Sequence, residues 1–141
     1  MSELLKNYET LETLHIKVFD HPELKRINHK VSSLESFCPN IRYLSITGIK
    51  FTKQLIAPIG TLQKLQFLKL WFYDDDDVDD DDDELLKLVT RFAKVLPLTL
   101  QYLDLKDYTT WLDLYADIFL ENCKVPLKKL SIGDVYNEQN Y

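Results

Sequence analysis

The residue types that most often carry out catalysis or bind metals are sparse in this chain of 141 residues. Its three histidines, His15, His21 and His29, fall in one early segment, and no cysteine is spaced to complete a zinc site with them. None of the three glycines belongs to a Gly-rich phosphate-binding loop. We therefore expect no catalytic residues, no cofactor and no metal site, and a protein that is not an enzyme.

The densest chemical feature is a run of carboxylates in the middle of the chain. Residues 74–84 hold nine Asp and one Glu, interrupted by Val78, whereas the rest of the chain carries 17 basic and 13 acidic residues. Charges packed this closely repel one another and bury no apolar area, so the sequence predicts a solvated acidic loop. The acidic residues of this loop are Asp74, Asp75, Asp76, Asp77, Asp79, Asp80, Asp81, Asp82, Asp83 and Glu84.

Three interpretations of the acidic loop stay open. The first is that the loop is a tolerated expansion between a strand and a helix. The second is that it attracts a basic partner such as a histone, with an association rate that depends on salt. The third is calcium binding, although the run lacks the Gly and the spaced ligands of a defined calcium loop. Residues 81–84 should also stabilise the start of the next helix through its dipole. The second interpretation gives an alternative function, that of an acidic binder or chaperone of basic proteins.

A repeated apolar pattern provides the elements that must position any site. The pattern L-x-x-L-x-L, with Ile replacing Leu at some positions, starts at residues 11, 41, 65, 100 and 127. Its alternation predicts short strands with one buried face, and the segments between the copies carry apolar residues at helical spacing. Such a repeat is typical of leucine-rich-repeat proteins. We predict one α/β domain over residues 1–141, a leucine-rich-repeat solenoid of about five strand–helix units with a curved parallel sheet and outer helices.

Aligning the five copies predicts which side chains share the concave face of this sheet. Successive side chains of a strand alternate between faces, so the third, fifth and seventh residues of each copy point away from the core. Aromatic and basic side chains of this kind are enriched in interface hot spots, although neighbouring aromatics also stack on each other within a sheet. These two interpretations do not exclude each other. The predicted partner-binding residues are Tyr43, Phe67, Lys69, Trp71, Tyr102 and Lys106.

One repeat resembles a known family closely enough to suggest a partner. The segment Leu34-Glu-Ser-Phe-Cys38-Pro39-Asn40-Ile41, continuing through Leu44 to Ile46, resembles the cysteine-containing repeat of F-box/leucine-rich-repeat proteins, and the uneven repeat lengths resemble the ribonuclease-inhibitor-like type. In the F-box family the repeats hold a substrate while a separate F-box binds the ubiquitin-ligase adaptor. The resemblance implies substrate recognition, with any contact to the adaptor made through an F-box that this sequence does not show.

Several classes of protein are disfavoured by bulk properties. No stretch reaches the roughly 18 apolar residues of a membrane span, and the first residues lack the pattern of a signal peptide. We expect no membrane and no nucleic-acid partner, a cytoplasmic or nuclear location, and buried free thiols at Cys38 and Cys123. After the last strand only a polar tail, residues 137–141, is expected, which would leave the edge of the sheet open to pairing.

Overall fold

The repeated apolar pattern forms an α/β structure in which parallel strands alternate with helices. In the computed structural model, residues 10–17, 30–72, 82–107, 115–134 and 138–140 are described. Within these ranges, five parallel strands and one short antiparallel strand make a single sheet. The described elements are β1 (Thr13–Lys17), α3 (Leu34–Phe37), β2 (Tyr43–Ile49), α4 (Lys53–Gly60), β3 (Phe67–Phe72), α5 (Asp82–Val95), β4 (Tyr102–Asp107), α7 (Ala116–Asn122), β5 (Lys129–Asp134) and β6 (Glu138–Asn140).

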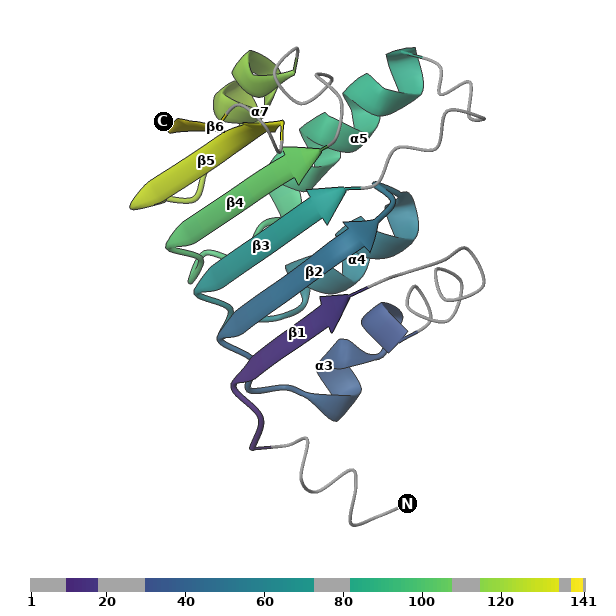
Figure 1. Ribbon diagram of the computed structural model, residues 1–141, viewed down its shortest axis with the longest axis vertical. Coiled ribbons are helices and arrows are strands. Elements are labelled where there is room, and N and C mark those ends of the chain that lie inside the picture. The colour runs from purple at the N-terminus through teal and green to yellow at the C-terminus, as the bar shows by residue number, and fades with distance from the viewer. Residues whose placement is uncertain (1–9, 18–29, 73–81, 108–114, 135–137, 141) are drawn as a thin grey trace.

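The strands lie in the sheet in the order in which they occur in the chain, β1 to β6 (Figure 1). Equivalent residues of the five apolar copies pair directly across β1 to β5, which is the register predicted from the repeat. One row of paired residues consists of Leu14, Leu44, Leu68, Leu103 and Leu130. Because the register is constant, each column of side chains runs straight across the sheet.

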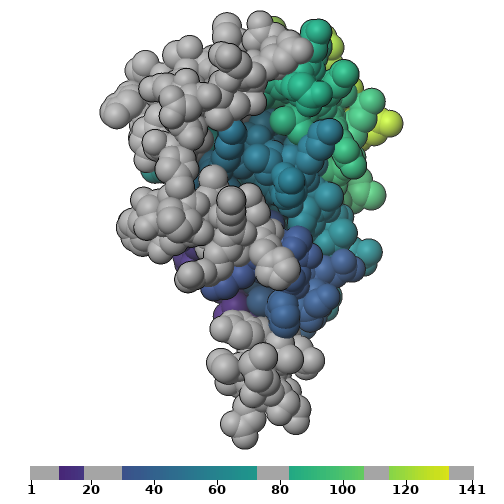
Figure 2. Space-filling view, turned by 90° about the vertical axis from the view of Figure 1, so that its right-hand side faces the viewer, coloured from purple at the N-terminus to yellow at the C-terminus, as the bar shows by residue number. Residues whose placement is uncertain are grey.

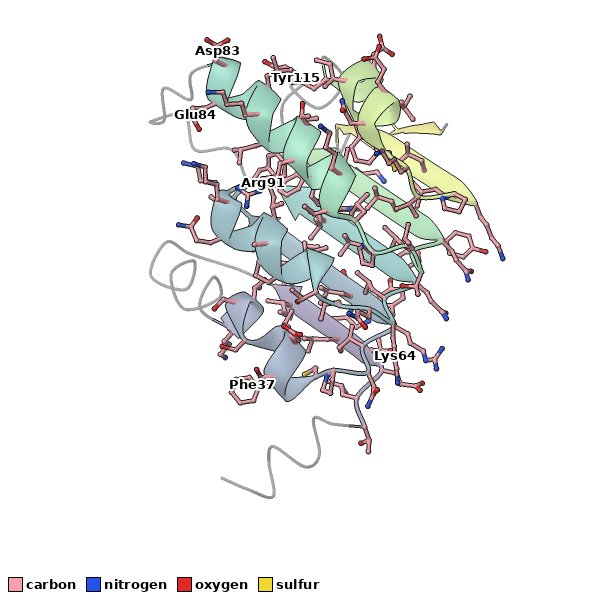
Figure 3. The ribbon with its side chains drawn as sticks, turned by 180° about the vertical axis from the view of Figure 1, so that it is seen from behind. Phe37, Lys64, Asp83, Glu84, Arg91 and Tyr115 are labelled. Atoms are coloured by element: carbon pink, nitrogen blue, oxygen red, sulfur yellow. The ribbon has the colours of Figure 1, made fainter. Side chains whose placement is uncertain are left out.

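All of the described helices lie on one face of the sheet, as Figures 1 and 3 show from opposite sides. The inward side chains of β2 to β5 are almost completely buried there, with Leu44 and Leu68 at 0% exposure. Each helix adds apolar residues to this core. The successive strand–helix units follow one another along the long axis of the molecule (Figure 2). The large helix residues in the core are Val31, Leu34, Leu55, Ile56, Ile59, Val89, Phe92 and Phe119.

The first unit is less well buried than the others. Leu14 and Ile16 of β1 are only partly buried, whereas their partners Leu44 and Ile46 in β2 are fully buried. Among the described residues, β1 is paired on one side only. The apolar face is therefore complete from β2 onward.

Helix α4 contains Pro58 and continues to Gly60. One helix boundary differs from the sequence prediction. Helix α5 begins at Asp82, so residues 82–84 of the predicted acidic loop belong to the first turn of a helix rather than to a loop. A negative first turn is stabilised by the helix dipole, which explains why the helix extends back into the acidic run. Asp20 and Pro22, residue types that are typical of a helix start, lie outside the described residues.

The expectation of an open sheet edge after the last copy is wrong for part of β5. Residues of the polar tail form β6, which pairs antiparallel with β5 from Ser131 to Gly133. Backbone amides and carbonyls form these pairs irrespective of side-chain polarity, so a Glu-Gln-Asn segment can serve as an edge strand.

A bulge interrupts the otherwise regular pairing at the end of β2. The register shifts between Thr47 and Ile49, so that Ile49 pairs with Phe72 of β3. Gly48 has a positive φ of 82°, a conformation that glycine adopts without the steric cost that a Cβ would bring. The extra residue allows Ile49 to point into the core, where it is fully buried.

None of the described helices is both long enough and apolar enough to cross a membrane.

Candidate interaction face

The outward side of β1 to β5 carries the predicted interaction residues. We call this side, which the described helices do not cover, the helix-free face (Figure 1). It consists of the third, fifth and seventh residues of each apolar copy, paired in three rows. These rows are Thr13, Tyr43, Phe67, Tyr102 and Lys129; His15, Ser45, Lys69, Asp104 and Ser131; and Lys17, Thr47, Trp71, Lys106 and Gly133.

Ring side chains lie near one another on the first four strands, with Tyr43, Phe67 and Tyr102 in the first row and His15 in the second. Tyr43 and Phe67 stack with their centroids 4.3 Å apart and their planes 7° from parallel. Phe67 and Tyr102 are more widely separated, at 6.2 Å and 35°, and His15 lies 5.1 Å from Tyr43. The stacking interpretation of these aromatics is therefore confirmed for Tyr43 and Phe67. Both rings remain only partly buried, and Tyr102 is 38% exposed.

Trp71 is the centre of a second cluster, which joins β3 and β4. The ammonium of Lys69 lies 4.2 Å from the centroid of the indole ring, and that of Lys106 lies 5.5 Å from it. The indole Nε1 donates a hydrogen bond of 3.5 Å to Oδ2 of Asp104. Two cation–π contacts and one hydrogen bond therefore restrain the orientation of the Trp71 ring.

Lys106 is not the exposed basic side chain that the sequence suggested. It is only 5% exposed, forms an ion pair with Asp104 and donates a hydrogen bond of 3.4 Å to Oγ of Ser131. Its partner in β5 is Gly133, which has no side chain, and Ser131 is small, so the long stem of Lys106 can lie over β5. Lys106 therefore stabilises the cluster instead of presenting its charge to a partner.

A hollow opens beside these two clusters. It is bordered by Phe67, Tyr102, Asp104, Lys129 and Ser131 and has a volume of about 100 Å³. Its lining includes two aromatic rings, a carboxylate and a hydroxyl, and the last two are already engaged by Lys106. This combination suits an inserted apolar side chain whose neighbours are polar.

The other predicted chemical residues are more dispersed. Asp83 and Glu84 are exposed in the first turn of α5 (Figure 3), whereas residues 74–81 of the acidic loop lie outside the described residues. His21 and His29 also lie outside them. His15 and Asp104 sit in the same row, separated by Ser45 and Lys69, so they form no pair.

Three contributors to the helix-free face were not predicted as site residues. His15 extends the aromatic row, while Asp104 and Ser131 hold the ammonium of Lys106. The signal for Asp104 was available, since Asp104 and Lys106 are two residues apart on one strand and therefore share a face. The role of Ser131 depends on how far the side chain of Lys106 reaches from β4 to the neighbouring β5. The repeat pattern does not specify this reach.

Both cysteines are free thiols, as predicted, with Cys38 buried and Cys123 partly buried. Burial raises the pKa of both thiols. Neither is a low-pKa nucleophile. Within the described ranges, no group of three or more His, Cys, Asp or Glu side chains is placed to hold a metal ion.

Comparisons with known proteins add no further assignment. No protein-family model, no curated protein and no solved structure matches the chain. The side chains of the helix-free face are therefore the basis for a functional proposal.

Proposed function

We propose that this protein is a non-enzymatic interaction module that binds a protein partner on the helix-free face. The observation that supports this proposal is the partly exposed aromatic row of Tyr43, Phe67 and Tyr102 beside the ordered Trp71 cluster. Aromatic side chains held in fixed rotamers bury large areas at little entropic cost, which is why they dominate interface hot spots.

The same proposal includes the leucine-rich-repeat solenoid architecture. Its support is the recurring L-x-x-L-x-L pattern, the constant register of the parallel strands and the helices on one face of the sheet. In such solenoids the sheet lines the concave side, and partners bind there. The helix-free face of this chain would then be the concave binding surface.

Capture of partners by matched variants tests the proposal. Partners recovered from cells by the parent protein are compared with those recovered by Phe67→Ala, Trp71→Ala and Phe37→Ala. Phe37 is the control, because it is 42% exposed but projects from α3 on the opposite side of the sheet. We expect at least one partner to be lost with both face variants and kept with Phe37→Ala.

Direct binding then completes the test. The purified partner should bind the parent protein and Phe37→Ala with similar affinity by calorimetry, and Phe67→Ala and Trp71→Ala more weakly by about tenfold or more. The two face variants should keep thermal stability close to that of the parent. Unaltered binding together with a large fall in stability would contradict the proposal and leave the aromatic row a purely structural feature.

A narrower prediction follows from the family resemblance of residues 34–46. If the repeats read a ubiquitin-ligase substrate, the natural full-length product should co-purify with a ubiquitin-ligase adaptor. The same variants of the helix-free face should lose the substrate but keep the adaptor, because the resemblance assigns the adaptor contact to an F-box.

The acidic run supports a second candidate function, binding of basic proteins. Its nine Asp and one Glu contrast with a net basic remainder of the chain, and Asp83 and Glu84 are exposed. A variant in which residues 74–81 are replaced by a neutral Gly-Ser linker distinguishes the two functions. Retained partners favour the helix-free face, whereas loss of histone binding that is also abolished by salt favours the acidic run.

A further inference from the structure

The charge of the helix-free face is opposite to that of the whole chain. The chain has a formal net charge of -6, but the described side chains of this face include four lysines, Lys17, Lys69, Lys106 and Lys129, and a single carboxylate, Asp104. Asp104 and Lys106 neutralise each other in an ion pair. Among the described side chains, no ion pair neutralises the positive charges of Lys17, Lys69 and Lys129 on this face.

These three lysines lie on one diagonal of the sheet. Lys17 is the seventh residue of its copy on β1, Lys69 the fifth on β3 and Lys129 the third on β5. Each step crosses two strand spacings of about 4.8 Å and two residues of about 3.3 Å, which places neighbouring lysine Cα atoms about 12 Å apart. Lys17 and Lys129 are exposed, and the ammonium of Lys69 is held over Trp71.

The hollow lies on the same diagonal, between Lys69 and Lys129. Its border includes Lys129 itself, together with Phe67 and Tyr102 from the aromatic row. An extended peptide advances about 3.3 Å per residue, so about four residues cover the distance between neighbouring lysines. Residues four apart also point to the same side of an extended chain, as do residues two apart. A side chain midway between two acidic residues would therefore face the hollow.

We propose that the partner of this face is an extended acidic peptide segment, with acidic side chains about four residues apart and an apolar side chain between two of them. This proposal rests on the proposed function and adds the chemistry of the partner. The acidic groups pair with Lys17, Lys69 and Lys129, and the apolar side chain fills the hollow between Phe67 and Tyr102. A basic partner would instead meet three lysines, since Asp104 is already paired.

Synthetic peptides test the proposal on the full chain. The probe is Glu-Ser-Ser-Ser-Glu-Ser-Phe-Ser-Glu, and the matched control replaces every Glu by Gln. Binding is measured by calorimetry or fluorescence anisotropy at two salt concentrations. We expect the Glu probe to bind about tenfold or more tightly than the Gln probe, with the difference shrinking as salt rises.

Charge reversal identifies the face that binds the probe. Lys17→Glu and Lys129→Glu should each weaken the Glu probe by about tenfold, because each replaces an attractive contact with a repulsive one. Lys94→Glu is the control, since Lys94 is exposed in the last turn of α5 on the helix-covered side; it should change affinity by less than about twofold. Thermal unfolding of each variant verifies that it is folded.

The contrary outcomes separate this proposal from the proposed function. Equal binding of the Glu and Gln probes, or an equal loss with Lys94→Glu, would overturn the acidic partner. If the Gln probe binds and Phe67→Ala weakens it, the face remains an interaction site with a neutral partner. If neither probe binds, the acidic partner is also overturned, and the capture experiment with Phe67→Ala and Phe37→Ala still decides the proposed function.

Discussion

The two faces of the sheet are built by alternate residues of the same strands but differ in burial and in residue type. On β3, Leu68 and Leu70 point toward the helices and are fully buried, whereas Phe67, Lys69 and Trp71 point away and are only partly buried. The helix-covered face is uniform from strand to strand, consisting of Leu and Ile in every described position of the two inward rows. The helix-free face mixes aromatic, basic, acidic and small side chains.

This difference shows that one set of strands supplies the core of the fold on one face and the candidate site on the other. Burial of apolar side chains is roughly proportional to area and has no directional requirement, so similar residues serve in every strand of the covered face. Stacked rings, cation–π contacts and ion pairs depend on particular neighbours, so the helix-free face needs a specific residue at each position. Changes on the two faces should therefore have different consequences.

The largest expected difference is between adjacent residues of β3. Leu68→Ala should lower the free energy of unfolding by about 3 to 4 kcal/mol, because it removes a fully buried side chain and leaves a cavity. Phe67→Ala should lower it by about 1 kcal/mol, since its ring is partly solvated and loses mainly its stacking on Tyr43. Urea unfolding followed by circular dichroism measures both. Equal losses would show that the two faces do not differ in this way.

The ion pair of Lys106 and Asp104 is the exception on the helix-free face, because it behaves like a buried element. Asp104→Ala should cost about 3 kcal/mol of stability, since it leaves a buried ammonium without its carboxylate. The matched control is the double variant Asp104→Leu/Lys106→Met, which removes both charges and should lie within about 1 kcal/mol of the parent. If the double variant is as unstable as Asp104→Ala, packing rather than charge explains the loss.

The sequence predicted the covered face far better than the helix-free face. Leu44, Leu68 and Leu103 follow a period-two pattern that is independent of their neighbours, so both their burial and their register could be predicted. The positions of Tyr43 and Phe67 on the other face followed from the same alternation. The residues sharing each face were thus predictable, and so was the stacking of Tyr43 on Phe67, but the contacts of Lys106 were not.

The features that escaped prediction depend on contacts between distant residues. Lys106 is buried because Gly133 and Ser131 leave space above β5, and that space is visible only once the strands are paired. Strand β6 forms by backbone pairing, which leaves no apolar pattern in the sequence.

A smaller effect should report on the layer of helices behind the sheet. A Cβ added at Gly60, at the end of α4, would lie 2.9 Å from the carbonyl oxygen of Val95 at the end of α5. Gly60→Ala should therefore force the two helix ends apart and cost about 2 kcal/mol. Gln54→Ala, an exposed change in the same helix, is the control and should be nearly neutral. A neutral Gly60→Ala would mean that the helix layer tolerates expansion without loss of stability.

The smallest predicted effect distinguishes the closely stacked pair of the aromatic row, Tyr43 and Phe67, from the more widely spaced pair, Phe67 and Tyr102. A double-mutant cycle with Tyr43→Leu and Phe67→Leu should give a coupling energy of about 1 kcal/mol, because these rings stack at 4.3 Å and 7°. The same cycle for Phe67 and Tyr102, which are 6.2 Å apart and tilted by 35°, should give about half as much or less. Equal coupling energies would mean that the three rings form one continuous stack. A weaker second coupling would leave Tyr102 free to turn toward the hollow that it borders, where an inserted side chain could replace the missing stacking contact.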